Sequence, residues 1–413
     1  MESLCCTGVW WLPSCPRNVL HGQLEFHPFQ GAYLNTFGVF DACAGQTATQ
    51  QEIVLGVCAN GRLVTLVQVA GAPAATTLQY ESQQTQPLFA NMWSLRAQLV
   101  IMGRHLTDVE QLQFDRVRVL YSHLDKWVDI HGFRIVHSSN KKCTVYYNQP
   151  QPIGCKLYND PLSFAFCLNK SSSNTQVQLQ QTMFVRWQLT QERSWQQLQH
   201  KLLQLQNLLS FGANMPVQPQ HIEALMLNCN QPVQLLYRLR GFPATHQAAT
   251  IAAPLFTLQD IAQQLDMHLK CWFDKARLLQ PVHMLYFALV FGPTLYAQNK
   301  FLHLVQALET YHSRTHAGAA SLSKRLCEVL RNLTDVLAFK PGQMEPFIKQ
   351  VVRTRNYLTH YSKSHEKQYA DRQQLNELTR QLRDAVRAVL LQEAGFSKTA
   401  IKKMLSRMQS PFA

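Results

Sequence analysis

The chain has 413 residues, 46% of them hydrophobic and 15% charged, which is enough for two or three domains that bury their own cores. The formal net charge is +14 with the histidines neutral, and such a surplus favours a polyanionic partner, because Lys and Arg gain by displacing counterions from phosphates. The longest apolar run, VHMLYFALVFG, is too short to span a bilayer, and the early Glu2 does not fit a secretory signal. We therefore expect a soluble, cytoplasmic protein.

Up to about residue 190 the sequence shows short apolar or alternating runs that are separated by turn residues, such as AYLNTFGVFD and EIVLGVCANGRLVTLVQVAG. Alternation with β-branched and aromatic residues is typical of β-strands. The pair Asn60-Gly61 is the strongest short cue for a hairpin. This half is predicted to be an antiparallel sandwich or barrel.

The next segment changes to helical spacing. One stripe of a helix would carry Trp195, Leu198, Leu202, Leu205 and Leu209. Gly212 is expected to end this helix near a C-cap. Two further pieces, HIEALMLN and QPVQLLYRL, are predicted to form a hairpin that returns to the sheet.

From residue 258 onward nearly all of the chain is predicted to be helical. The expected helices are 258–279, 282–291, 295–313, 321–338, 343–362, 371–393 and 398–408, with Pro and Gly between them. Short connections between helices of this length favour an antiparallel bundle. The prediction is an α+β multidomain protein, with a β-rich domain at 1–255 and an all-helical domain at 256–413.

Several classes of chemistry lack their usual motifs. The sequence contains no phosphate-binding glycine loop, no G-x-S-x-G elbow and no H-E-x-x-H. The eleven cysteines form no C-x-x-C pair and have no histidine at zinc-finger spacing, so we expect free thiols in a reducing compartment. We expect neither a metal site nor a cofactor.

The charge surplus concentrates near the C-terminus, where residues 340–413 hold 14 Lys/Arg against 6 Asp/Glu. Within this region, RNYLTH places Asn356 and His360 four residues apart, on one helix face. Arg355 precedes His360 by five residues and so lies about 140° from it around the helix, but its long side chain can bend toward the same cleft. A solvated basic face is the simpler interpretation of this spacing alone.

An Arg/His pair also meets the needs of RNA cleavage. Arginine provides a planar, permanently charged fork for a phosphate, and histidine exchanges protons near neutral pH. RNA carries its own nucleophile, the 2′-hydroxyl, so no metal is needed.

RNYLTH resembles the R-x4-H signature of the HEPN superfamily, small helical bundles that dimerise and of which many are metal-independent endoribonucleases. Other segments resemble the ApeA type of this superfamily. The start of its N-terminal domain resembles GVWWLPSCPRNVLHGQLEFHPFQGAYLNTFGVF, its interdomain passage resembles LFTLQDIAQQL, and an early helix of its HEPN domain resembles LVQALETYHSRT. The resemblance extends over nearly the whole chain.

The resemblance implies that Arg355 and His360 are catalytic, with Asn356 as the polar second position of the motif. It also implies that Glu309, on a facing helix, orients the site, although Glu309 could instead neutralise His312 or Arg314. His365 is an alternative proton carrier. Family members controlled by adenylylation have a tyrosine two residues after the histidine, where this chain has Ser362, so that regulation is not expected.

Five residues near the motif are candidates for RNA contacts: Lys349, Arg353, Tyr357, Tyr361 and Lys363. For the basic residues a solvated face is the alternative, and for the tyrosines it is packing against each other at i, i+4.

The resemblance further implies an anti-phage defence protein that acts by abortive infection. Its N-terminal domain would sense a phage-derived trigger, and its C-terminal domain would cleave cellular RNA, such as tRNA, to 2′,3′-cyclic phosphate and 5′-hydroxyl ends. The chain would form a homodimer or a higher even oligomer. The alternative is a catalytically inactive HEPN module that binds RNA or a nucleotide and acts as a scaffold.

Overall fold

The structure is a computed structural model. It describes residues 1–40, 50–74, 92–139, 142–191, 193–241, 253–292, 295–337, 339–361 and 369–408. Contacts divide the chain into two compact units. Unit 1 comprises Met1–Ser122, His131–Leu202 and Gln218–Arg240, and unit 2 comprises His123–Ile130, Leu203–Val217 and Gly241–Ala413. The predicted domain boundary after residue 255 stays a prediction.

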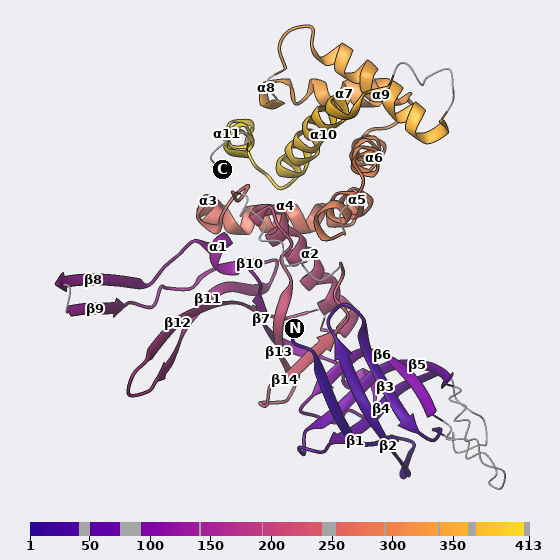
Figure 1. The fold of residues 1–413 in the computed structure, drawn as a ribbon, viewed down its shortest axis with the longest axis vertical. Coiled ribbons are helices and arrows are strands. Elements are labelled where there is room, and N and C mark those ends of the chain that lie inside the picture. Colours follow the sequence, from indigo (N-terminus) through magenta and orange to yellow (C-terminus); the bar gives the residue numbers. More distant parts are fainter. Residues whose placement is uncertain are drawn as a thin grey trace. The chain divides into compact units, whose positions relative to one another are not determined.

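Unit 1 contains one large antiparallel sheet (Figure 1). Its strands are β1 (Leu4–Leu12), β2 (Cys15–His27), β3 (Gly31–Phe37), β4 (Gln50–Cys58), β5 (Leu63–Ala74), β6 (Met92–Met102), β7 (Phe114–Tyr121), β10 (Ile153–Leu157), β11 (Asp160–Ser172), β12 (Val177–Gln188), β13 (Pro219–Met226) and β14 (Val233–Tyr237). The strand order is β10-β11-β12-β7-β13-β14-β6-β3-β2-β1-β4-β5. Because β5 also pairs with β6, six strands close into a barrel, as the alternating pattern predicts.

The barrel interior follows from the alternation of side chains along each strand. In β2 the inward residues Leu24 and Phe26 are 0% and 2% exposed, and between them Glu25 faces solvent. Trp10 of β1 is fully buried and lies over Gly56 of β4, where any Cβ would meet the indole ring. A glycine in β4 therefore makes room for a fully buried tryptophan of the core.

Local turn chemistry positions the hairpins. Asn60 Oδ1 accepts from Arg62 N at 3.1 Å, and Gly61 has φ +79°, so the predicted β4–β5 hairpin is confirmed. The predicted return hairpin is also confirmed, because β13 and β14 pair with each other. A further hairpin, β8 (Phe133–Ser139) with β9 (Lys142–Tyr147), forms a separate two-stranded sheet (Figure 1). A short 3-10 helix, η1 (Val109–Gln111), precedes β7.

One expectation about the cysteines is wrong. Cys6 and Cys58 form a disulfide with their Cα atoms 5.9 Å apart. They are 52 residues apart in sequence and meet because β1 pairs with β4. Strand pairing, which sequence spacing does not reveal, brings them together.

Unit 2 is helical. Its elements are α1 (Leu124–Val128), α2 (Trp195–Ala213, from Leu203 onward), α3 (Leu258–Ile261), η2 (Ala262–Gln264), α4 (Leu265–Ala276), α5 (Gln280–Phe291), α6 (Ala297–Thr315), α7 (Leu322–Arg331), α8 (Thr334–Leu337), α9 (Met344–His360), α10 (Arg372–Glu393) and α11 (Lys398–Met408). The predicted helix 258–279 is divided into α3, η2 and α4, and the helix 321–338 into α7 and α8. The second break places Leu333, which is 1% exposed, in the core.

The end of α2 differs from the expectation for Gly212. The helix continues through Ala213, and Asn214 has the left-handed conformation, with φ +55°. Gly212 instead allows close packing of Trp127 and Phe256 against α2, because a Cβ at this position would clash with the indole of Trp127 and lie 3.0 Å from the ring of Phe256. Asparagine is the residue besides glycine that most readily takes the left-handed conformation.

Helix α10 is the central helix of unit 2 and packs against α4, α6, α8 and α11. Among the described residues, no helix is long and apolar enough to cross a membrane.

Candidate active site at the end of helix α9

Helix α9 carries the predicted motif in its last turns. Its buried residues Phe347, Ile348, Val351, Thr354 and Leu358 lie on one side of the helix. The helix ends at His360, because Tyr361 takes the left-handed conformation, with φ 47° and ψ 35°, and donates its N–H to Tyr357 O at 2.6 Å. The burial of one side leaves the other side of α9 for polar residues.

The side of α9 away from the core carries polar side chains at intervals of four, three and four residues: Lys349, Arg353, Asn356 and His360. At about 100° per residue they lie within a sector of about 60°. Lys349 and His360 are exposed, whereas Arg353 and Asn356 are half-buried. Two cations therefore lead along the helix toward His360.

Arg355 lies off this stripe, but its side chain turns toward it. Its Nη1 donates to Asn356 Oδ1 at 3.3 Å, and Asn356 is one turn before His360. Arg355 is half-buried, which limits the freedom of its guanidinium. The structure thus joins Arg355 to Asn356 directly and places His360 on the face of Asn356.

The chain that follows α9 returns to it. Thr354 Oγ1 accepts from Ala370 N at 3.1 Å, and the two residues are 0% and 1% exposed. The ring of Tyr357 stacks on that of Tyr369, with centroids 4.1 Å apart and planes 12° apart. The predicted RNA contact Lys363 and the alternative proton carrier His365 lie outside the described residues.

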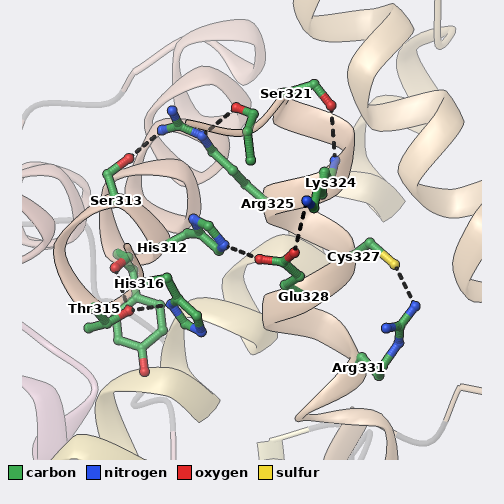
Figure 2. Close-up of polar contacts among 12 residues, drawn as sticks. His312, Ser313, Thr315, His316, Ser321, Lys324, Arg325, Cys327, Glu328 and Arg331 are labelled. Atoms are coloured by element: carbon green, nitrogen blue, oxygen red, sulfur yellow. Dashed lines mark hydrogen bonds and ion pairs between the residues drawn. The ribbon is translucent and has the colours of Figure 1, made fainter. Parts of the chain in front are cut away.

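Glu309, the predicted acidic residue of the site, lies on α6. Its Oε1 is 3.8 Å from Arg325 Nη1 of α7. Figure 2 shows that Arg325 also bonds Ser313, and its Nε donates to Ala320 O at 2.8 Å. Among the described residues the structure shows Glu309 in contact with α7 rather than with Arg355 or His360, so its role in orienting the site stays a prediction.

A second pair, His312 of α6 and Glu328 of α7, also joins these two helices (Figure 2). His312, 2% exposed, lies 2.5 Å from Glu328 Oε2 through its Nε2, and its ring stacks on His316 with centroids 4.4 Å apart. The hydrogen bond from His312 lowers the pKa of the Glu328 carboxyl. His312 is therefore paired with Glu328, and Glu309 with Arg325, which differs from the neutralisation within α6 that the sequence left open.

Sequence reasoning missed Thr354 and Tyr369. Thr354 occupies a core position in the helical pattern of α9, and a polar residue at such a position is a signal for a buried hydrogen bond. No pattern in the sequence indicates that Tyr369 stacks on Tyr357. In the parts of the chain that the structure describes, no group of three or more His, Cys, Asp or Glu residues is placed to hold a metal ion.

A β-barrel domain and a helical bundle whose surface helix presents Arg, Asn and His define a two-domain protein with a candidate polar site on the bundle. Residues 5–272 match the model of ApeA N-terminal domain 1, and residues 302–400 match that of Apea-like HEPN. The first match covers more than half of the chain, which therefore belongs to the ApeA family. Searches among curated proteins and solved structures gave no significant match.

The second match begins within α6 and runs through α10 into the start of α11, so it includes Glu309 and the segment Arg355 to His360. HEPN domains are generally ribonucleases that typically bind RNA and dimerise. Together the two matches support a HEPN nuclease of the defence type.

Proposed function

We propose that this protein is a metal-independent endoribonuclease whose active site is formed by Arg355 and His360. The observation that carries the proposal is the hydrogen bond from Arg355 to Asn356, which turns the guanidinium toward the face where His360 is exposed. A fixed cation and a proton-exchanging group then border the same open surface.

The chemistry follows from these two groups. The guanidinium of Arg355 binds the non-bridging oxygens of the scissile phosphate and stabilises the extra charge of the pentacoordinate transition state. The ribose 2′-oxygen attacks phosphorus, and the bond to the 5′-oxygen breaks. His360 removes the proton of the 2′-hydroxyl or donates one to the leaving 5′-oxygen. The products are a 2′,3′-cyclic phosphate and a 5′-hydroxyl.

One chain provides one Arg and one His, whereas both a base and an acid assist an in-line displacement. A two-fold dimer with both motifs at one cleft supplies the second set. Lys349 and Arg353 would contact phosphates along the RNA, as would Lys363. Tyr357 and Tyr361 are the candidates for contacts with bases, and Glu309 would orient the site from α6.

In this proposal the substrate is a cellular RNA, with tRNA as one candidate, and cleavage stops phage growth by abortive infection in the cytoplasm. The barrel domain senses a phage-derived trigger. No cofactor takes part.

The test is to incubate the purified full-length protein with total RNA, with EDTA or with magnesium, and to determine the chemistry of the new ends. We expect equal cleavage in both conditions and 2′,3′-cyclic phosphate ends. Cleavage that is lost in EDTA and restored by magnesium would contradict a metal-independent reaction. Tight RNA binding without cleavage would support the inactive scaffold instead.

A further inference from the structure

Three tyrosines form a cluster at the end of α9: Tyr357, Tyr361 and Tyr369. The ring of Tyr357 is stacked on Tyr369 at 4.1 Å and meets the ring of Tyr361 edge to face at 5.6 Å. Tyr357 is half-buried, so its ring is largely occupied by protein contacts. This arrangement makes Tyr357 a support and leaves the outermost ring, Tyr361, for another role.

Tyr361 combines high exposure with an unfavourable backbone. Its side chain is 67% exposed, and its φ of 47° lies in the left-handed region, which is unfavourable for a residue with a Cβ. The bond from its N–H to Tyr357 O and the ring contact with Tyr357 hold this conformation. Strained residues of this kind concentrate at functional sites.

A hydrogen bond to α9 holds the tyrosine cluster in place. The buried hydrogen bond from Ala370 N to Thr354 Oγ1, at 3.1 Å, fixes the chain next to Tyr369 against α9. This hydrogen bond holds Tyr369 in position. Tyr369 stacks on Tyr357, and Tyr357 in turn contacts the ring of Tyr361. An aromatic ring that is exposed but held in place loses little entropy when it binds a planar ligand.

We propose that Tyr361 is a stacking platform for one unpaired base next to the scissile phosphate, and that Tyr357 and Tyr369 are positioning residues for that platform. This rests on the proposed function, because Tyr361 directly follows His360. A base can stack on an aromatic side chain only when its own face is free, and within an A-form duplex the neighbouring bases cover it. The substrate class is thus RNA that is single-stranded at the cleavage site, such as a loop.

The experiment measures binding separately from cleavage. The probe is a fluorescent 12-nucleotide RNA with 2′-fluoro in place of every 2′-hydroxyl, which removes the nucleophile, and its binding is compared with that of the same strand in a duplex. Tyr361→Ala should weaken binding of the single strand by about 5- to 150-fold, the range found for loss of one base–aromatic stack, and change duplex binding little. Tyr361→Phe and Tyr361→Trp should bind nearly as well as wild type.

Two further variants separate positioning from folding. Tyr369→Ala should weaken single-strand binding partly, whereas Tyr369→Phe should not, since the ring and not the hydroxyl makes the stack. Tyr296→Ala is the matched control, because Tyr296 is 81% exposed on the same unit and should not matter. Melting curves of all the variants check that they are folded.

The inference is overturned if Tyr361→Ala binds the single strand as wild type does, if Tyr361→Phe loses as much as Tyr361→Ala, or if wild type does not prefer the single strand over the duplex. Failure of the proposed function looks different. In that case wild type binds the fluorinated strand through Tyr361 but does not cleave the ordinary RNA.

Discussion

Arg387 of α10 is the residue whose replacement should most clearly test the packing of unit 2. It is 8% exposed, and its Nε donates to Tyr286 Oη at 3.3 Å while its Nη2 donates to Asn214 Oδ1 at 2.5 Å. Its Nη1 is 3.6 Å from Asp384 Oδ1. Arg387→Met keeps much of the aliphatic length and removes all three interactions.

The magnitude follows from what remains after the change. Breaking a buried ion pair by removing one partner costs about 3–5 kcal/mol when the other charge is left uncompensated. Asp384 keeps Arg380, whose Nη1 lies 3.2 Å away, so the loss should fall near the lower limit, about 3 kcal/mol. For a unit of roughly 200 residues this lowers Tm by about 6–12 °C.

Calorimetry of the full chain should show this shift in the transition of unit 2. The matched control is Arg380→Met on the same helix, because Arg380 pairs with the same Asp384 but is 48% exposed, so its loss should cost at most about 1 kcal/mol. If Arg387→Met and Arg380→Met lower Tm equally, Arg387 does not act as a buried crosslink between α10, α5 and Asn214.

Three other results are expected. Burial disfavours the charged form of Asp160, but hydrogen bonds from Lys201, at 2.7 Å, and Thr190 outweigh it and lower the pKa of this carboxyl. The ionised carboxyl of Asp160 therefore stabilises the fold above its unfolded pKa, and this contribution is lost as the pH falls below about 4. In Asp160→Asn the free energy of unfolding, measured with urea, should fall less steeply at acidic pH than in wild type. An unchanged pH dependence would show that Asp160 does not contribute in this way. The binding constant for single-stranded RNA should fall by about 0.7 log units per tenfold rise in salt for each phosphate contacted. Replacing Lys349 and Arg353 together by Gln should therefore reduce the slope of log binding constant against log salt by about 1.4. An unchanged slope would mean that these two residues do not contact the RNA. If wild-type and His360→Ala chains are unfolded, mixed equally and refolded, about a quarter of the dimers are wild type on both sides. RNA cleavage should then be well below half of that of the same amount of unmixed wild-type dimer. Cleavage at one half, with exchange verified by differently tagged chains, would mean that each protomer has its own independent site.

Local features of the fold were predictable because they depend on neighbours in sequence. The pair Asn60-Gly61 predicted its hairpin, and the change from alternating to helical spacing predicted where strands give way to helices. The closure of the barrel by β5 on β6 and the Cys6–Cys58 disulfide depend on pairing between distant segments, which no local pattern records.

The same distinction applies to the candidate site. Helical spacing predicts that Asn356 and His360 share a face, because that is a property of the helix itself. It does not predict that Arg355 bonds Asn356, or that Glu309 pairs with Arg325, because these depend on side-chain conformation and on helix packing. The hydrogen bond from Arg387 to Asn214, 173 residues away in sequence, depends on helix packing in the same way.

The most direct test of the proposed active site is to replace His360 by Ala and measure cleavage of RNA, with melting curves to confirm folding. His360 is exposed at the end of α9, so its loss should leave Tm nearly unchanged. General acid–base assistance contributes about 10² to 10⁴-fold, and cleavage should fall by that factor, whereas His200→Ala, at an exposed histidine of α2, should be as active as wild type. Cleavage by His360→Ala at the wild-type rate would contradict the assignment of the active site to this helix end.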